Sequence, residues 1–181
     1  NAFGKVFASR TISGPSSLPI SDEPSLGAWP SAAPVPNASV PATAAPASTD
    51  YPPAITDSAY SGHWYTTGSG HKFAVVHVAQ GYYYGTISYM KNSSTSVSSH
   101  YVLNSDYNSD GADPGELTQM VREAYYAWHA RCWNQHSLGC EHEGFVSNPA
   151  WFTEAMYQSS GALYRHFCDK FGFAKDRNHV D

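Results

Sequence analysis

The stretch HKFAVVHVAQG, residues 71–81, decides the fold class, because it reads as a short apolar strand followed by a histidine and a glycine. Phe73–Val78 has the apolar, β-branched composition of a buried strand in a sheet. An imidazole near the end of such a strand must find a hydrogen-bond partner or a metal ion, since an unpaired polar group is costly to bury. His77 is therefore the first candidate functional residue.

The composition of the 181 residues divides the chain into two parts. Residues 1–60 hold most of the 12 prolines, with much Ala and Ser, and this density of Pro favours an extended segment. The segment reads either as a flexible linker or as a tail docked on its own domain or on a neighbouring copy. Residues 61–181 hold most of the aromatic residues, so we expect them to form one folded domain.

Charge and hydropathy exclude two classes of partner. A net charge of −5 gives no basic surface for nucleic acid, and no apolar run approaches the roughly 18 residues that cross a bilayer. Few charges with many Tyr, Ser, Thr and Asn favour an exported protein.

Asn37 and Asn92 begin N-glycosylation sequons. Cys132 and Cys140 are close enough in sequence for a disulfide in an exported protein, and buried free thiols are the alternative.

The order of predicted elements indicates a mixed β-sheet flanked by helices, an α/β fold. Strands or extended pieces are expected at residues 73–78, 100–104, 117–122, 126–129 and 138–143, with 117–122 as the hairpin partner of 100–104. Helices are expected over 84–91 and from about Pro149 to Phe171, with Gly172 as the terminator. Residues 177–180 read as the start of a further strand.

Histidines and acidic residues concentrate in WHARCWNQHSLGCEHEG, residues 128–144. Because alternate residues of a strand share a face, Glu141 and Glu143 are expected on one side and Cys140 and His142 on the other. The spacing contains no HxxxH or CxxC pair, so spacing alone favours a solvated face rather than a zinc site.

The loop DYNSDGADPGE, residues 106–116, contains the first half of a calcium-binding pattern. Asp106, Asn108 and Asp110 occupy positions 1, 3 and 5, and Gly111 follows at position 6. Position 12 is Leu117 instead of the usual bidentate Glu. An ordinary polar turn is the alternative, because Asp, Asn and Gly are common turn residues.

Tyrosines Tyr82, Tyr83, Tyr84 and Tyr89 form an aromatic run after the first strand. Such rings stack on sugars and are also enriched at protein interfaces. Half-buried packing is the third interpretation.

Four segments together resemble the type 2 N-acetylmuramoyl-L-alanine amidases, which are zinc amidases related to the peptidoglycan recognition proteins. The resemblance covers residues 71 to 181. It rests on the strand-end His77, SSHY at 98–101, WHA…WN…HSLG within 128–139, and the E-x-EG pattern at 141–144, in the order found in the family.

The resemblance implies a fold and a reaction. Family members cleave the amide between the lactyl group of muramic acid and L-alanine, with a zinc ion that polarises the carbonyl and activates water. By resemblance, His77 is the first zinc ligand and Glu141 the general base. Ser99 stands where other branches of the family place a Tyr, so Glu141 is expected to act alone. His129 and Asn134 match positions that line the muropeptide groove, and His100 matches a histidine close to the site.

The family's second His ligand and its Asp or Cys follow the strand that begins at residues 177–180, and His179 falls a few residues short of the expected position. Three explanations stay open: a fragment, ligands from another chain, or a fold kept for binding or assembly. The first hypothesis is therefore an extracellular, cell-wall zinc amidase of peptidoglycan. The second is an inactive amidase fold used for extracellular structure, self-assembly or cell-wall glycan binding.

Overall fold

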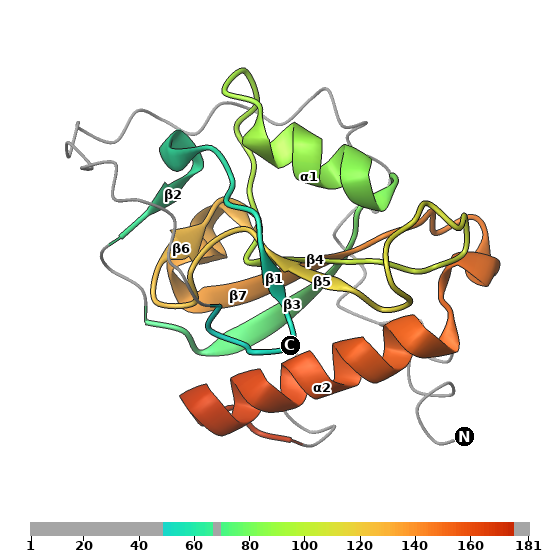
Figure 1. The fold of residues 1–181 in the computed structure, drawn as a ribbon. Coiled ribbons are helices and arrows are strands. Elements are labelled where there is room, and N and C mark those ends of the chain that lie inside the picture. The colour runs from blue at the N-terminus through green and yellow to red at the C-terminus, as the bar shows by residue number, and fades with distance from the viewer. Residues whose placement is uncertain (1–48, 67–69, 176–181) are drawn as a thin grey trace, which may run out of the picture. The chain divides into compact units, whose positions relative to one another are not determined.

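A computed structural model describes residues 49–66 and 70–175, and Figure 1 shows how their elements are arranged. Within these residues, five strands form the main sheet in the order β1-β5-β4-β7-β3. The strands are β1 (Ile55–Thr56), β5 (Leu117–Gln119), β4 (Tyr101–Leu103), β7 (Ser137–His142) and β3 (Phe73–Val78). Strand β7 is parallel to both β3 and β4, β1 is parallel to β5, and β4 is antiparallel to β5. The mixed sheet and the β4–β5 pairing confirm the sequence prediction.

A smaller sheet and three short helices complete the strand-rich part. Strands β2 (Trp64–Tyr65) and β6 (Tyr126–Ala127) pair antiparallel. The 3₁₀-helices are η1 (Ser61–His63), η2 (Arg131–His136) and η3 (Pro149–Trp151). Helix η2 leads directly into β7, so it brings residues 128–136 beside the central strands.

Two α-helices, α1 (Tyr83–Lys91) and α2 (Glu154–Phe171), cover opposite faces of the main sheet (Figure 1). Each buries one stripe of apolar side chains, as its spacing predicts. The core on the α1 side contains Tyr83, Ile87, Met90, Val102, Met120 and Val121. The core on the α2 side contains Tyr101, Leu103, Leu138, Cys140, Met156, Leu163 and Phe167.

The predicted start of the last helix near Pro149 is wrong by about one turn. Pro149 opens the separate 3₁₀-helix η3, and α2 begins only after Thr153. The Thr153 hydroxyl accepts a hydrogen bond from the amide of Met156, which satisfies one of the free donors of the first turn. Gly172, at φ 74°, ends α2 in the left-handed conformation that glycine adopts without strain, as predicted.

Strand β3 is less buried than its apolar sequence suggests. It is the last strand in the sheet order of the described residues, and the side chain of Val76 is 47% exposed. The expectation of a fully buried strand is therefore wrong, because only one neighbour, β7, covers β3 in the part of the chain that the structure describes.

The end of the Pro-rich region joins the sheet through Asp50. Its carboxylate accepts hydrogen bonds from Arg122 (2.9 and 2.7 Å), from Gln119 (2.7 Å) and from the amide of Glu123 (2.8 Å). Strand β1 follows a few residues later. Residues 49–60 thus belong to the described fold, whereas Asn37, most of the expected extended segment, and the strand expected at 177–180 lie outside the described residues.

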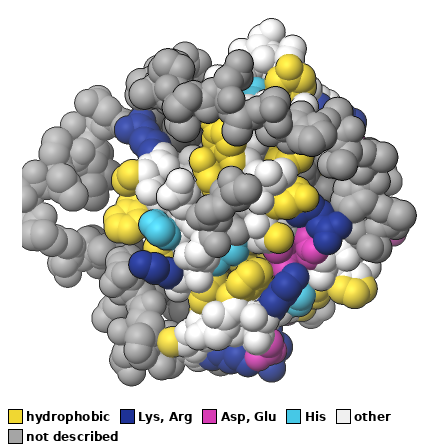
Figure 2. All heavy atoms as spheres, turned by 90° about the vertical axis from the view of Figure 1, so that its left-hand side faces the viewer, with side chains coloured by type: hydrophobic (Ala, Val, Ile, Leu, Met, Phe, Trp, Pro, Cys, Tyr) yellow, Lys and Arg dark blue, Asp and Glu magenta, His cyan; other side chains and the backbone are white. Residues whose placement is uncertain are grey.

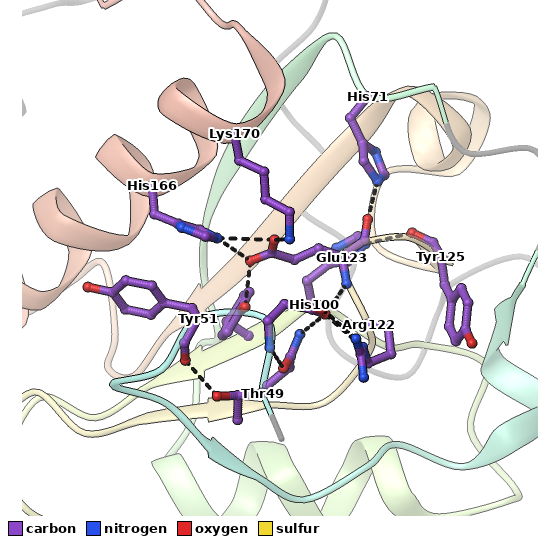
Figure 3. Close-up of polar contacts among 12 residues, drawn as sticks. Thr49, Tyr51, His71, His100, Arg122, Glu123, Tyr125, His166 and Lys170 are labelled. Atoms are coloured by element: carbon purple, nitrogen blue, oxygen red, sulfur yellow. Dashed lines mark hydrogen bonds and ion pairs between the residues drawn. The ribbon is translucent and has the colours of Figure 1, made fainter. Parts of the chain in front are cut away.

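Glu123 is a fully buried carboxylate at the centre of the same region, and Figure 3 shows the side chains around it. It accepts a hydrogen bond from the Tyr101 hydroxyl (2.6 Å) and pairs with His166 (3.0 Å) and Lys170 (2.7 Å) of α2. These partners offset the cost of burying the Glu123 carboxylate away from water. The loop before β6 is therefore fixed to α2 on one side and to Asp50 on the other.

Candidate active site

The candidate site lies on the sheet face opposite α2. His77 of β3 and Glu141 of β7 are partners in the parallel register of the two strands, so their side chains share a face. Cys140 and His142 point the other way: Cys140 belongs to the core beneath α2, and His142 Nε2 contacts Ser160 Oγ of α2 (2.8 Å). This alternation was predicted from the sequence.

The Glu141 carboxylate has no neutralising partner among the residues that the structure describes. Within residues 49–66 and 70–175, no hydrogen bond or ion pair to its side chain is found. Burial raises the pKa of Glu141 from its ordinary value of 4.5 to about 7. A carboxylate that titrates near neutral pH is suited to accept and return a proton during a reaction.

His77 is held at both its ring and its main chain. Its Nε2 lies 2.9 Å from His129 Nδ1, and its carbonyl oxygen accepts a hydrogen bond from His142 Nδ1 (3.0 Å). Burial, with a smaller contribution from nearby His142, lowers the pKa of His77 to about 4. The imidazole is therefore neutral at physiological pH, which is the form that binds metal ions.

His129 packs directly over Gly139 of β7 and is only 3% exposed. A β-carbon at position 139 would lie 2.5 Å from His129 Nδ1, so any larger residue would displace the ring. Its Nε2 contacts the carbonyl and hydroxyl oxygens of Ser137, each at 3.3 Å. His129 therefore stands behind His77 rather than at the open surface.

Asn134 fixes the loop that carries His129. Its side-chain oxygen accepts hydrogen bonds from the amides of His129 (3.1 Å) and Ala130 (2.6 Å). Asn134 is half-buried, and its predicted role in lining a substrate groove stays a prediction.

His100, which the resemblance places close to the site, is fully buried, and a role in substrate binding stays a prediction. His100 Nδ1 accepts a hydrogen bond from the amide of Gly139, and Nε2 contacts the carbonyl of Tyr125, both at 3.1 Å. Burial lowers the pKa of His100 to about 3, so the ring is a neutral bridge between β7 and the loop before β6.

The supporting contacts of three residues were not predicted: Ser137, His142 and Glu143. Glu143 lies just beyond β7 and accepts hydrogen bonds from the amides of Tyr83 (2.9 Å) and Ser105 (2.8 Å). It ties together the loops that follow β3 and β4. The E-x-EG pattern was the available signal for Glu143, whereas the partners of His142 and Ser137 could not be read from the sequence.

The described residues do not complete a metal site. Within residues 49–66 and 70–175, no group of three His, Cys, Asp or Glu side chains is placed to hold a metal ion. His77 thus offers one ligand for a zinc ion, and the described donors do not supply the rest. His179 lies outside the described residues.

The structure gives the calcium prediction at Asp106, Asn108 and Asp110 no support. The Asp110 carboxylate accepts hydrogen bonds from Asn104 (3.2 Å) and from the amide of Ala112 (3.1 Å), as in an ordinary polar turn. Among the described residues of this loop, no three acidic or other donor side chains are placed to hold a metal ion.

The disulfide considered for Cys132 and Cys140 is not formed in the structure. Cys132 is an exposed free thiol on η2, and Cys140 is a free thiol buried beneath α2. One thiol faces solvent and the other lies in the core, so their closeness in sequence does not lead to a disulfide. Asn92 is exposed at the end of α1, and its glycosylation stays a prediction.

The surface and the aromatic run add two observations. Among the residues coloured in Figure 2, Lys and Arg side chains are scattered rather than joined into a continuous basic area. Tyr83 is buried and contacts Thr118 and Glu116, whereas Tyr82, Tyr84 and Tyr89 are exposed.

In the described part of the chain, no helix has the length and apolar character needed to cross a membrane.

The sheet and its two covering helices form an α/β domain that carries His77 and Glu141 on one face, and its fold is that of solved amidase structures. The chain belongs to the N-acetylmuramoyl-L-alanine amidase family, whose sequence profile matches residues 67–181. It is 34% identical over 123 residues to N-acetylmuramoyl-L-alanine amidase A of Achromobacter lyticus. That alignment covers 68% of this chain and 66% of the relative, so the chain spans just under two thirds of the relative's length.

Solved structures show the same fold. A selenomethionine derivative of AmpD is 21% identical, with a TM-score of 0.52, and the match covers 66% of this chain and 76% of AmpD. The N-acetylmuramoyl-L-alanine amidase LysC from Clostridium intestinale URNW is 14% identical, with a TM-score of 0.50, over 68% of this chain and 79% of LysC. At these identities, the likeness concerns the fold.

Proposed function

We propose that this domain hydrolyses the amide bond between the lactyl group of N-acetylmuramic acid and L-alanine in peptidoglycan. The observation that carries the proposal is the pair formed by His77 and Glu141, which share one sheet face in a domain of the amidase family. Glu141 is half-buried, lacks a partner among the described residues and has a pKa raised to about 7.

Glu141 acts as the general base and then as the general acid. Its carboxylate takes a proton from water as the water oxygen bonds to the carbonyl carbon of the amide. The carboxyl group then gives the proton to the nitrogen as the carbon–nitrogen bond breaks, which releases the L-alanyl peptide as an amine. Proton transfer of this kind contributes about 10²–10⁴-fold in rate.

Zinc dependence is part of the proposal and is supported by family membership. Neutral His77 is the ligand that the described residues supply. No step of the reaction above is assigned to the metal, because the described residues do not show its other ligands. Action at the cell wall, outside the cytoplasm, is part of the proposal and is supported by family membership.

The test uses the full chain and an N-acetylmuramoyl-L-alanyl peptide, with products identified by mass spectrometry. We expect cleavage at the lactyl–alanine bond, stimulated by zinc and abolished by chelator. Glu141→Gln should lower kcat about 10²–10⁴-fold. Glu154→Gln is the matched control, since Glu154 is exposed on α2 and contacts only Gln158 among the described residues. Equal rates for Glu141→Gln and the wild-type chain would reject the proposal.

The second candidate is an inactive amidase fold that binds cell-wall glycan or assembles with copies of itself. It is favoured by one observation, the lack of a three-donor metal group within residues 49–66 and 70–175. This candidate predicts that the chain sediments with purified peptidoglycan without releasing peptide, with or without added zinc. Zinc-dependent release of peptide would reject it.

A further inference from the structure

The hydrogen bonds around His129 determine which of its nitrogens carries a proton. The hydroxyl of Ser137 donates to the carbonyl of Trp133 (2.9 Å), so its oxygen faces His129 as an acceptor. The carbonyl oxygen of Ser137 is an acceptor as well. Both oxygens lie near His129 Nε2. An unprotonated Nε2 would direct its lone pair at two acceptors, so Nε2 is the nitrogen that carries the proton.

The tautomer of His129 in turn decides that of His77. In neutral His129, a proton on Nε2 leaves Nδ1 with a lone pair. His77 Nε2 lies 2.9 Å from this Nδ1, so His77 Nε2 must donate the proton of that hydrogen bond. Neutral His77 then has an unprotonated Nδ1, and no hydrogen bond to this atom is found within the described residues.

We propose that His129 is a positioning residue that fixes His77 in the Nε2–H tautomer and so leaves the Nδ1 lone pair as the atom that His77 offers to a ligand. The ligand class is an electron-pair acceptor such as a divalent cation. Only the use of Nδ1 to bind metal rests on the proposed function; the tautomer itself does not. In metal sites, a partner behind the ligand commonly orients the ring in this way.

Gly139 and Ser137 also hold His129 in place. Gly139 provides the space in which the His129 ring lies, and Ser137, two residues earlier on β7, supplies the two acceptors. Glu141 follows two residues later on the same face. Strand β7 therefore carries the glycine against which His129 packs, the acceptors that orient His129, and the candidate base.

The first test reads the tautomer directly in the full chain, labelled with ¹⁵N-histidine, treated with chelator and kept at pH 8. Long-range proton–nitrogen NMR spectra distinguish a protonated from an unprotonated ring nitrogen. We expect His77 to show a protonated Nε2 and an unprotonated Nδ1. The opposite pattern in the wild-type chain would overturn the proposal, and this measurement needs no variant and no activity.

The second test removes the acceptor. His129→Leu should convert His77 to a mixture of tautomers, whereas His129→Asn keeps an acceptor oxygen near the position of Nδ1 and should preserve the Nε2–H form. His136→Asn is the control, because His136 contacts the carbonyl of Gly70 rather than His77. An unchanged tautomer in folded His129→Leu would overturn the proposal. If His129→Leu does not fold, the wild-type spectrum and His129→Asn still decide it.

Calorimetry with zinc alone separates this inference from the proposed function. If the chain binds zinc, His129→Leu should weaken binding about 10–100-fold and His136→Asn should not. Unchanged affinity in His129→Leu would overturn the positioning role. A wild-type chain that binds no zinc would contradict the zinc part of the proposed function, while the NMR spectra would still decide the tautomer.

Discussion

Glu141 on β7 lies opposite His77 on β3, in the register of two parallel strands, and their side chains share the sheet face away from α2. The pairing places a carboxylate with a pKa of about 7 beside an imidazole with a pKa of about 4. Burial is the main cause of both shifts, and it leaves a neutral imidazole and a readily protonated carboxyl at one place on the sheet.

Glu141→Gln is expected to stabilise the metal-free protein at pH 8. The folded-state pKa of Glu141 is raised above 4.5, so the folded state binds more protons than the unfolded state between about pH 4.5 and 7. The free energy of unfolding therefore falls as pH rises through this window, and the Gln variant avoids the loss. We expect a gain of roughly 1–3 kcal/mol at pH 8 and little difference at pH 4. Thermal unfolding in chelator measures it, and a gain that is the same at both pH values would contradict the prediction.

Gly139→Ala is expected to destabilise the fold and to disturb His129. The new β-carbon would lie 2.5 Å from His129 Nδ1, and forcing extra volume into a packed site costs about 1–3 kcal/mol. Gly161→Ala is the matched control, because nothing lies within 4 Å of a β-carbon at this position of α2. Alanine favours helices, so Gly161→Ala should stabilise by about 0.5–1 kcal/mol. Urea unfolding of both variants checks the contrast, and similar losses in the two would count against the packing of His129 over Gly139.

Asp50→Asn is expected to cost roughly 1–3 kcal/mol at neutral pH, because it removes a buried acceptor from Arg122 and from the amide of Glu123. Although burial opposes ionisation, hydrogen bonds from Glu123, Gln119 and Arg122 lower the pKa of Asp50 below 3.8. Its contribution to stability is therefore present above pH 3.8 and is lost as pH falls through the lower folded-state pKa.

Asp57→Asn is the control for Asp50. Asp57 pairs with Lys91 at 2.6 Å, but both side chains are more than two fifths exposed, and exposed ion pairs contribute about 0–1 kcal/mol. Chemical denaturation at pH 7 compares the two variants. If Asp57→Asn cost as much as Asp50→Asn, the importance assigned to the buried network in Figure 3 would be contradicted.

Much of the fold could be predicted from the sequence. The apolar, β-branched composition of residues 73–78 indicated β3, and the segments 100–104 and 117–122 were expected to pair as the hairpin that β4 and β5 form. The start of α2 was misplaced because Pro149 and Thr153 both carry helix-start signals, and only the tertiary contacts decide between them.

The candidate site was less predictable, since its supporting contacts join residues distant in sequence. His77 and Glu141 were found through family motifs, and their register agrees with a shared site. The burial of His100 could not be read from one sequence, so its contacts with Gly139 and Tyr125 were not predicted. The contacts of His142 were not predicted because its partners, the His77 carbonyl and Ser160, come from β3 and α2. Asp50 was missed because it lies near the end of the Pro-rich region and its partners follow about 70 residues later.

The central claim is that β7 holds a carboxylate able to accept a proton at neutral pH, and a carboxyl-carbon NMR titration of Glu141 in chelator-treated protein tests it most directly. Comparison with Glu141→Gln assigns the signal. The account predicts a midpoint near pH 7. A midpoint at or below the ordinary value of 4.5 would show a solvated or paired carboxylate and would contradict the account.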